Sequence, residues 1–319
     1  MKFKTMVLIF FFIPIAYAQQ PPVPEIRYES VPDPLKLPPH LYLGEAAGVA
    51  VNSEGHIFVY SRSGRTQLLE FDQEGNFMRI IGDDLYGFVF AHAVRVDKND
   101  NVWCVDEGSN MVIEFSPEGR VLMVFGRKAE AVEHPAPNEP PPSRPDWMFD
   151  RPTDVTWDRE GDIFVSDGYG NSRVVKYDKD GNWVKAWGRR GAAPGEFHTP
   201  HSIAADAQGN VYVGDRENRR IQVFDAEGNF LRQWTNVGAP WAICITPGPH
   251  QVLYSSDSVP GRIYKLDLNG NILGAFGKAG KQLGQFGWVH EIACPSEDIL
   301  YVAELLNWRV QKLILHAGQ

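Results

Sequence analysis

The chain has 319 residues, of which 43% are hydrophobic and 22% are charged, and its formal net charge is −9. This composition is ample for a large hydrophobic core, and one all-β domain of this size is ordinary. An acidic chain lacks the clustered basic residues that bind a phosphate backbone. We therefore expect no nucleic-acid partner.

The N-terminus predicts a secretory signal over residues 1–18. Lys2 and Lys4 precede an apolar run over residues 6–15, and Ala16-Tyr17-Ala18 is a typical cleavage site. The apolar run is short for a membrane span. Cleavage removes the two lysines, so the charge becomes −11 (−9 minus 2). We expect a single domain over residues 19–319, secreted or periplasmic, with no membrane span after cleavage; an uncleaved anchor is the alternative.

Repeated units follow along the chain. Residues 25–31 (EIRYESV) are a lone strand candidate, and units of four strand-like runs then cover residues 47–82, 92–126, 153–188 and 201–234. Weaker copies start at Trp241 and His290. Short β-rich runs separated by Gly and Asn turns indicate antiparallel strands. Six four-stranded units at a blade-like spacing predict an all-β fold, a six-bladed β-propeller.

Two segments lie outside the regular units. The last unit has three strands before the chain ends, so closing the ring requires a fourth strand from elsewhere, and residues 25–31 are the candidate. A Pro-rich insertion over about residues 127–150 cannot continue a sheet ladder. We expect it to be a loop over one face of the propeller, either a surface insertion or a lid.

The three cysteines, Cys104, Cys244 and Cys294, each lie in an apolar, strand-like run. An odd number in an exported chain does not make a disulfide framework. We interpret all three as buried free thiols.

When the six units are aligned, one residue of each unit falls at the start of the strand that should line the central channel. The aligned residues are Ala47, His92, Thr153, His201, Trp241 and His290. Histidine thus occurs in alternate units, which lie about 120° apart in a six-bladed ring. Three neutral imidazoles with an open fourth position suit a catalytic zinc ion. The alternative is a polar channel lining around water.

The position after the second strand carries arginine in the first and fourth units, Arg62 and Arg216. Two guanidinium groups on opposite sides of the ring suit a ligand with a carboxylate. The alternative is that both arginines form structural ion pairs. Tyr169 follows the same position in the third unit. A tyrosine near cations can have a lowered pKa and serve as a base.

The preceding position is almost uniformly acidic. It holds Ser61, Asp106, Asp167, Asp215, Asp257 and Glu304. So regular a pattern favours a structural role over catalysis, and we expect these side chains to form hydrogen bonds from blade to blade.

The units VYVGDRENRRIQVFDAEGNF and IFVSDGYGNSRVVKYDKDGNW resemble NHL repeats. More narrowly, residues 151–224 resemble peptidyl-α-hydroxyglycine α-amidating lyase, with a weaker likeness over about residues 48–315. That family is a six-bladed propeller with zinc in its channel, and it converts a peptidyl-α-hydroxyglycine into a peptide amide and glyoxylate. The resemblance implies a monomer whose substrate is a small peptide or N-acylglycine derivative with a free carboxylate.

The resemblance also implies roles for particular residues. It assigns zinc to His92, His201 and His290, the catalytic tyrosine to Tyr169 in SDGYGNSR, and two functional arginines to Arg62 and Arg216. A structural calcium would be bound by the backbone carbonyls of Val49 and Val94 and by an acidic side chain, here Glu291.

The chain departs from the family at three places. Glu291 replaces an aspartate, Trp288 replaces a methionine of the animal enzymes, and Gly170 replaces a cysteine of a family disulfide. Two other functions therefore stay open: a non-catalytic NHL-repeat binding propeller of the cell envelope, and a different metal-dependent propeller hydrolase or lyase. The histidine set argues against the latter, because such enzymes commonly use carboxylate and asparagine ligands.

Overall fold

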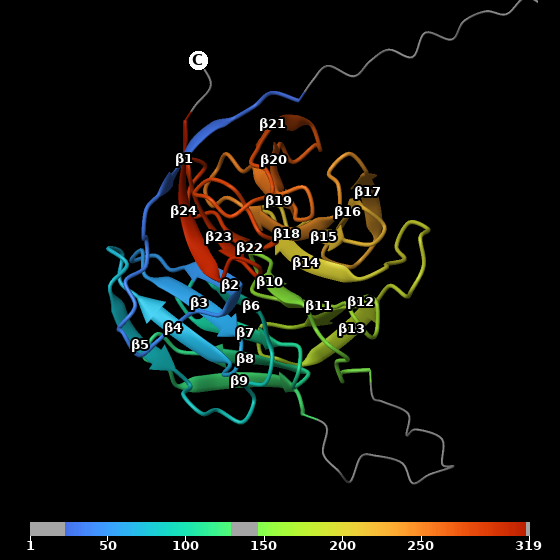
Figure 1. Ribbon diagram of the computed structural model, residues 1–319. Coiled ribbons are helices and arrows are strands. Elements are labelled where there is room, and N and C mark those ends of the chain that lie inside the picture. The colour runs from blue at the N-terminus through green and yellow to red at the C-terminus, as the bar shows by residue number, and fades with distance from the viewer. Residues whose placement is uncertain (1–22, 129–145, 317–319) are drawn as a thin grey trace, which may run out of the picture.

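The computed structural model describes residues 23–128 and 146–316, which form a ring of six four-stranded antiparallel sheets (Figure 1). The predicted all-β, six-bladed propeller is confirmed. The proposed signal peptide and most of the Pro-rich insertion lie outside the described residues. Within the described ranges, no helix has the length and hydrophobicity needed to cross a bilayer.

Each blade runs outward from the axis. The inner strands are β2 (Glu45–Val51), β6 (Ala91–Val96), β10 (Asp154–Trp157), β14 (Pro200–Ala205), β18 (Pro240–Ile245) and β22 (Val289–Ala293). The second strands are β3 (Ile57–Arg62), β7 (Val102–Asp106), β11 (Ile163–Asp167), β15 (Val211–Asp215), β19 (Leu253–Asp257) and β23 (Ile299–Glu304). The third strands are β4 (Gln67–Phe71), β8 (Met111–Phe115), β12 (Arg173–Tyr177), β16 (Arg220–Phe224), β20 (Arg262–Leu266) and β24 (Arg309–His316). The outer strands are β5 (Phe77–Ile81), β9 (Val121–Gly126), β13 (Trp183–Trp187), β17 (Phe230–Trp234), β21 (Ile272–Phe276) and β1 (Arg27–Val31).

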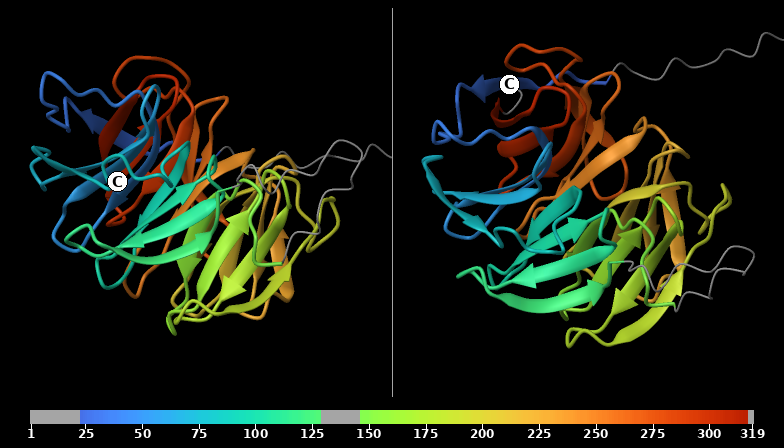
Figure 2. Two further views of the ribbon diagram at one scale, coloured as in Figure 1. Left: turned by 90° about the horizontal axis from the view of Figure 1, so that it is seen from below. Right: turned by 60° about the horizontal axis from the view of Figure 1, so that its bottom comes forward.

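The inner strands converge on one axis, and each contacts the inner strands of the two neighbouring blades (Figures 1 and 2). We number the blades 1 to 6 from β2 to β22. The hydrophobic core lies between the blades: Val105 and Phe125 of blade 2, for example, belong to one cluster with Val155 and Tyr177 of blade 3. Because every blade buries both faces in this way, the position of each inner strand is fixed by its neighbours.

The same type of turn connects the third strand to the outer strand in several blades. Asp72 starts the turn between β4 and β5, and its Oδ1 accepts the backbone N–H groups of Glu74 and Asn76. Gly75 has a φ of 77°, a left-handed conformation that glycine adopts without strain. The same Asp-x-x-Gly-Asn turn begins at Asp178, Asp225 and Asp267. This is the turn chemistry that the sequence repeats predicted.

The N-terminal strand closes the ring, as predicted. β1 pairs antiparallel with β24, and Tyr28 faces Leu315 across the ladder. The Tyr28 ring packs 4.8 Å from Phe276 of blade 5 and 6.4 Å from Phe286, between centroids, and its hydroxyl donates to the carbonyl of Gly284. The N-terminal strand therefore joins blade 6 and also holds it to blade 5.

The expectation of three free thiols is wrong for two of them. Cys244 and Cys294 form a disulfide, whereas Cys104 is free and buried. Cys244 belongs to β18 and Cys294 follows β22, so the bond joins the inner strands of neighbouring blades. An odd number of cysteines argues against a disulfide framework, but it does not exclude one disulfide bond. Cys244 and Cys294 come together because blades 5 and 6 are neighbours in the ring.

The closure of the ring gives a testable prediction. Tyr28→Ala should lower the free energy of unfolding by about 2 kcal/mol, because it removes an aromatic ring packed between two blades. Urea denaturation followed by tryptophan fluorescence measures the loss. Arg27→Ala, at an exposed position of the same strand, is the control. Equal stability of the two variants would contradict a closing role for β1.

Candidate functional site

Each of the three predicted histidines occupies a β-bulge at the start of an inner strand. Across β6 and β7, Ala91 faces Asp106 and Ala93 faces Val105, so His92 has no partner in the ladder. The pairings of β14 with β15 and of β22 with β23 skip His201 and His290 in the same way. A bulge re-aims its side chain relative to the regular alternation of a strand. Here the bulges bring three imidazoles together at one end of the channel.

The imidazoles form a compact triangle. The ring centroids lie 4.7 Å apart for His92 and His201, 4.6 Å for His92 and His290, and 4.9 Å for His201 and His290. The three side chains are buried, and each offers a ring nitrogen within 4.8 Å of the others. The structure therefore brings together the histidines that the sequence placed in alternate blades.

A hydrogen bond to the next blade fixes the orientation of each ring. His92 Nδ1 lies 2.5 Å from the carbonyl of Thr153, His201 Nδ1 lies 2.6 Å from that of Trp241, and His290 Nδ1 lies 2.7 Å from that of Ala47. A carbonyl only accepts, so Nδ1 carries the proton in each ring and Nε2 keeps a free lone pair. The three acceptors are the corresponding residues of the following blades.

Burial lowers the pKa of all three imidazoles, and it takes the pKa of His290 to about 3. The nearby Arg62 and Arg216 act in the same direction. The rings are thus neutral at physiological pH, the form that binds a metal. Three neutral imidazoles with Nδ1 held by carbonyls match the ligand set of a catalytic zinc ion, with a position left for substrate.

Tyr169, in the turn after β11, lies directly over this triangle. Its hydroxyl oxygen is 3.0 Å from His201 Nε2 and 3.3 Å from His92 Nε2, and Arg216 Nη1 donates to it at 3.3 Å. Burial raises the pKa of Tyr169, although Arg216 opposes that effect.

The two predicted arginines flank the triangle. The Arg216 guanidinium lies 4.6 Å from the ring centroid of Trp241 and 5.3 Å from that of Tyr169. Arg62 donates from Nε to Glu45 at 2.8 Å and from Nη1 to the carbonyl of Ala91 at 3.0 Å. Both guanidinium groups are thus held rigidly at the mouth of the channel, and both remain partly exposed.

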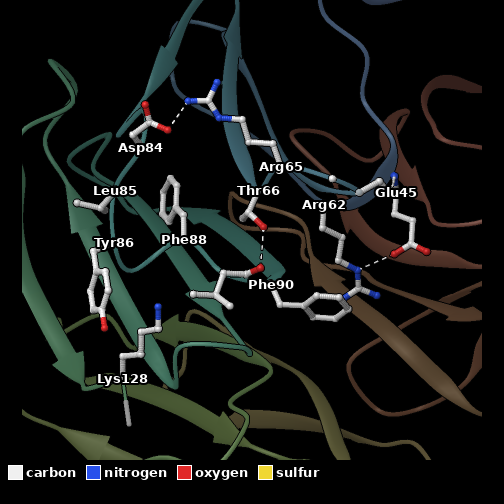
Figure 3. A pocket seen from close by; sticks show the side chains of 13 residues that line it. Glu45, Arg62, Arg65, Thr66, Asp84, Leu85, Tyr86, Phe88, Phe90 and Lys128 are labelled. Carbon is white, nitrogen blue, oxygen red and sulfur yellow. Dashed lines mark hydrogen bonds and ion pairs between the residues drawn. The ribbon is translucent and has the colours of Figure 1, made fainter. Parts of the chain in front are cut away.

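A pocket of about 630 Å³ opens beside Arg62 between blades 1 and 2. Figure 3 shows Arg62 turned toward Glu45 beside the ring of Phe90, with Tyr86 and Phe88 farther along the wall. The Arg62 guanidinium lies 3.9 Å from the Phe90 centroid. The pocket offers a partly aromatic surface that adjoins the histidine triangle through Arg62.

Sequence reasoning missed two residues of this site, Arg151 and Glu107. The Arg151 guanidinium lies 4.6 Å from the Tyr169 ring centroid, and its Nε donates to the buried Glu107 at 2.9 Å. Arg151 and Thr199 both precede a proline and both have a left-handed φ, 61° and 62°. In the sequence, Arg-Pro-Thr at residues 151–153 aligns with Thr-Pro-His at residues 199–201. Because Thr-Pro-His leads into a histidine of the site, this alignment was the signal that could have drawn attention to Arg151.

The near-uniform acidic position has a structural role, but mostly within a blade and not between blades. Asp215 accepts the backbone N–H of His198, and Glu304 accepts that of Gly287, each in the segment just before the inner strand of its own blade. The corresponding pairs are Asp106 with Phe90, Asp167 with Asp150, and Asp257 with Ala239. Asp106 alone among these five also reaches another blade, through the hydroxyl of Tyr60. These acids hold the segments that deliver the histidines.

Two of the noted departures alter the surroundings of the site. Trp288 packs against Trp241 with the rings tilted by 46° and the centroids 5.3 Å apart, so together they form an aromatic wall beside His201 and His290. A Cβ at Gly170 would lie 2.3 Å from Cγ of Asp150, so the Asp150 side chain occupies the space that the cysteine of the family pattern would need.

Val49, Val94 and Glu291 also meet in the channel, behind the histidines. The backbone N–H groups of both valines donate to Glu291 Oε2 at 3.1 Å, and Arg95 Nε lies 3.1 Å from Oε1. Burial raises the pKa of Glu291, and Arg95 opposes that effect. A carboxylate that already faces two N–H groups and a guanidinium does not fit a calcium ion.

Comparisons with known proteins identify the repeat and show which proteins the chain is similar to. The NHL repeat family matches residues 149–177 and 197–224, in blades 3 and 4. A probable peptidyl-α-hydroxyglycine α-amidating lyase of Caenorhabditis elegans is 27% identical over 314 residues, which cover 87% of this chain and 84% of that protein. NHL repeat-containing protein 3 of Homo sapiens is 31% identical over 244 residues, which cover 72% of this chain and 65% of that protein.

Among solved structures, a streptogramin B lyase matches with a TM-score of 0.60 at 15% identity, over 91% of this chain and 98% of that chain. A likeness at this identity concerns the fold alone.

The metal site gives a testable prediction. His201→Ala should leave the purified protein with little bound metal, because two imidazoles hold zinc far more weakly than three. Metal content by mass spectrometry after zinc loading and dialysis measures this. His250→Ala, at an exposed position away from the channel, is the control and should retain metal. Equal metal content in both variants would rule out the triangle as the binding site.

Proposed function

Because the chain belongs to the family of peptidyl-α-hydroxyglycine α-amidating lyases built from NHL repeats, we propose that it is a zinc-dependent lyase. Its substrate would be a peptidyl-α-hydroxyglycine or a related N-acyl-α-hydroxyglycine, and its products an amide and glyoxylate. One observation carries the proposal: three neutral, carbonyl-oriented imidazoles lie directly under Tyr169 and between two arginines.

The metal would be held by Nε2 of His92, His201 and His290. When bound, zinc acts as a Lewis acid that lowers the pKa of a coordinated hydroxyl by several units. The hydrogen bonds at Nδ1 keep the three lone pairs directed at one point before any ion arrives, so little reorganisation is needed.

Arg62 and Arg216 would bind the carboxylate of the substrate. Each guanidinium is anchored through Nε by an acid, Glu45 for Arg62 and Glu217 for Arg216, at 2.8 and 2.9 Å. Nη1 of Arg62 donates to the carbonyl of Ala91 and Nη1 of Arg216 donates to Tyr169, so Nη2 of each guanidinium is the nitrogen that could form a charge-assisted bond to the substrate. Anchored donors lose little entropy on binding, so they would hold the substrate carboxylate, which passes unchanged into glyoxylate, and would offset the negative charge that develops as the C–N bond breaks. The partly aromatic pocket beside Arg62 would accept the remainder of the acyl group.

Tyr169, as phenolate, would take the proton of the substrate hydroxyl. The oxygen's electron pair then forms the carbonyl of glyoxylate, and the C–N bond breaks with its electrons going to nitrogen. Tyr169 returns the proton to that nitrogen, which yields the amide and balances the reaction. Because burial raises the tyrosine pKa, the phenolate depends on its cationic surroundings, including Arg216 at the hydroxyl and Arg151 over the ring.

A non-catalytic binding propeller is the second candidate. It is supported by the similarity to human NHL repeat-containing protein 3, which is named for its repeats alone. This alternative predicts neither stoichiometric zinc nor turnover. A different reaction on the same metal is the third candidate, and it predicts zinc without glyoxylate release.

The direct test is glyoxylate release from an N-acyl-α-hydroxyglycine. Zinc-loaded protein should release glyoxylate, chelator-stripped protein should not, and added zinc should restore the activity. The corresponding N-acylglycine, which lacks the hydroxyl, is the negative control. Zinc-loaded protein without glyoxylate release would contradict the lyase proposal and leave a metal propeller of another activity, whereas absence of zinc and turnover would favour a binding propeller.

The role of Tyr169 is tested separately. Tyr169→Phe should keep the metal and lower kcat by about 10²–10⁴-fold, the usual contribution of a positioned acid–base group. Tyr301→Phe is the control, because Tyr301 pairs with Ala293 at the other end of the last inner strand. Unchanged kcat in Tyr169→Phe would show that the proton is taken elsewhere.

A further inference from the structure

Behind the histidines, three polar side chains satisfy the inward-facing backbone of the channel. Glu291 accepts the N–H groups of Val49 and Val94, as described above. Asp154 accepts that of Ile203 at 3.0 Å, and the Ser202 hydroxyl accepts that of Ile243 at 3.1 Å. Gly48 makes room for this arrangement, because a Cβ there would lie 2.7 Å from Oε2 of Glu291. The two carboxylates therefore occupy the axis and require a cation.

Arg95 supplies that cation from blade 2. Its Nε and Nη2 bond to the two carboxylate oxygens of Asp154 at 2.9 and 2.6 Å, and Nε lies 3.1 Å from Glu291 Oε1. Its Nη1 donates to the carbonyl of Ile292 at 3.3 Å, and Nη2 donates to the carbonyl of Ile243 at 3.2 Å. One guanidinium thus contacts blades 3, 5 and 6, and a 3.3 Å contact with Ser202 adds blade 4.

The environment keeps Arg95 charged. Burial opposes the charge, but Asp154 and Glu291 outweigh it and raise the pKa of Arg95 above its usual value. Calcium is bound by carboxylate and carbonyl oxygens. This guanidinium already engages oxygens of both kinds, the carboxylates of Asp154 and Glu291 and two backbone carbonyls. A divalent ion placed among them would also face a fixed positive charge at close range in a poorly solvated channel.

The three residues whose side chains contact Arg95 are each next to a residue of the histidine site. Glu291 follows His290, and Ser202 follows His201 in the chain. Asp154 follows Thr153, whose carbonyl accepts the Nδ1 proton of His92. A group that ties these neighbours together fixes the relative positions of the three imidazoles.

We propose that Arg95 is a built-in cation of the channel, which replaces a structural calcium ion and positions the three histidines from behind. In this protein a side chain would take the place of the structural calcium ion that the family resemblance implies. The inference concerns metal content and stability, so it stands or fails independently of the lyase activity.

The first experiment measures calcium in the wild-type, zinc-loaded protein. We expect no stoichiometric calcium by mass spectrometry and no change in Tm when calcium chloride is added. A calcium content near one ion per chain, or a rise in Tm with calcium, would overturn the proposal. The measurement needs no variant and no substrate, and it avoids chelators because these would also remove zinc.

The second experiment removes the Arg95 guanidinium from the channel. Arg95→Ala should lower Tm and weaken zinc retention, because two carboxylates are left unpaired on the axis. Added calcium should bind to those carboxylates and recover part of both losses. Arg173→Ala is the matched control: Arg173 is similarly shielded and pairs with the buried Asp167 at 3.0 Å, but it lies off the axis. Its loss of Tm should show no recovery with calcium.

Arg95→Lys is the third variant, and it tests the proposal even if Arg95→Ala does not fold. A lysine keeps the positive charge but not the planar fork, so zinc retention should fall less than in Arg95→Ala and should not respond to calcium. Arg95→Ala that folds with unchanged Tm and zinc content, or a calcium response in Arg95→Lys equal to that in Arg95→Ala, would overturn the proposal.

Discussion

The hydrogen bond from an imidazole Nδ1 to the backbone of the next blade is the interaction on which the site depends. It occurs three times, from His92 to Thr153, from His201 to Trp241 and from His290 to Ala47. Each bond fixes a tautomer and a ring plane, and each spans the boundary between two blades. The spacing of the imidazoles is therefore set by the spacing of the blades.

This dependence gives the closure of the ring a functional meaning. The bond from His290 to Ala47 joins the last blade to the first, so the triangle is complete only when blade 6 is in place. β1 supplies the outer strand of that blade, and the Cys244–Cys294 disulfide ties its inner strand to blade 5. The outer strand β1 and the disulfide between inner strands thus both help to hold the three histidine side chains in place.

The charges around the triangle are arranged in layers. Arg62 and Arg216 lie at the mouth, neutral imidazoles lie below them, and Arg95 lies behind with Asp154 and Glu291. Each arginine is paired with at least one acid, so the cations are held in place and their charge is partly balanced. The lowered histidine pKa values follow from burial next to these cations. The result is a site with unprotonated imidazole lone pairs and positively charged surroundings, suited to an anionic substrate.

The sequence by itself determined the propeller, the strand that closes it and the three histidines, because a repeat converts linear spacing into position around an axis. The same alignment gave Arg62 and Arg216, and the resemblance added the role of Tyr169. Only the tertiary structure decided which cysteines pair, that Arg151 covers Tyr169, and that Arg95 lies on the axis beside Glu291. The disulfide and the contacts of Arg95 join different blades, whereas Arg151 reaches Tyr169 within blade 3, and no repeat position shares these side chains. Periodicity fixes where a backbone lies, but where a long side chain ends depends on the charges and the space that its neighbours leave.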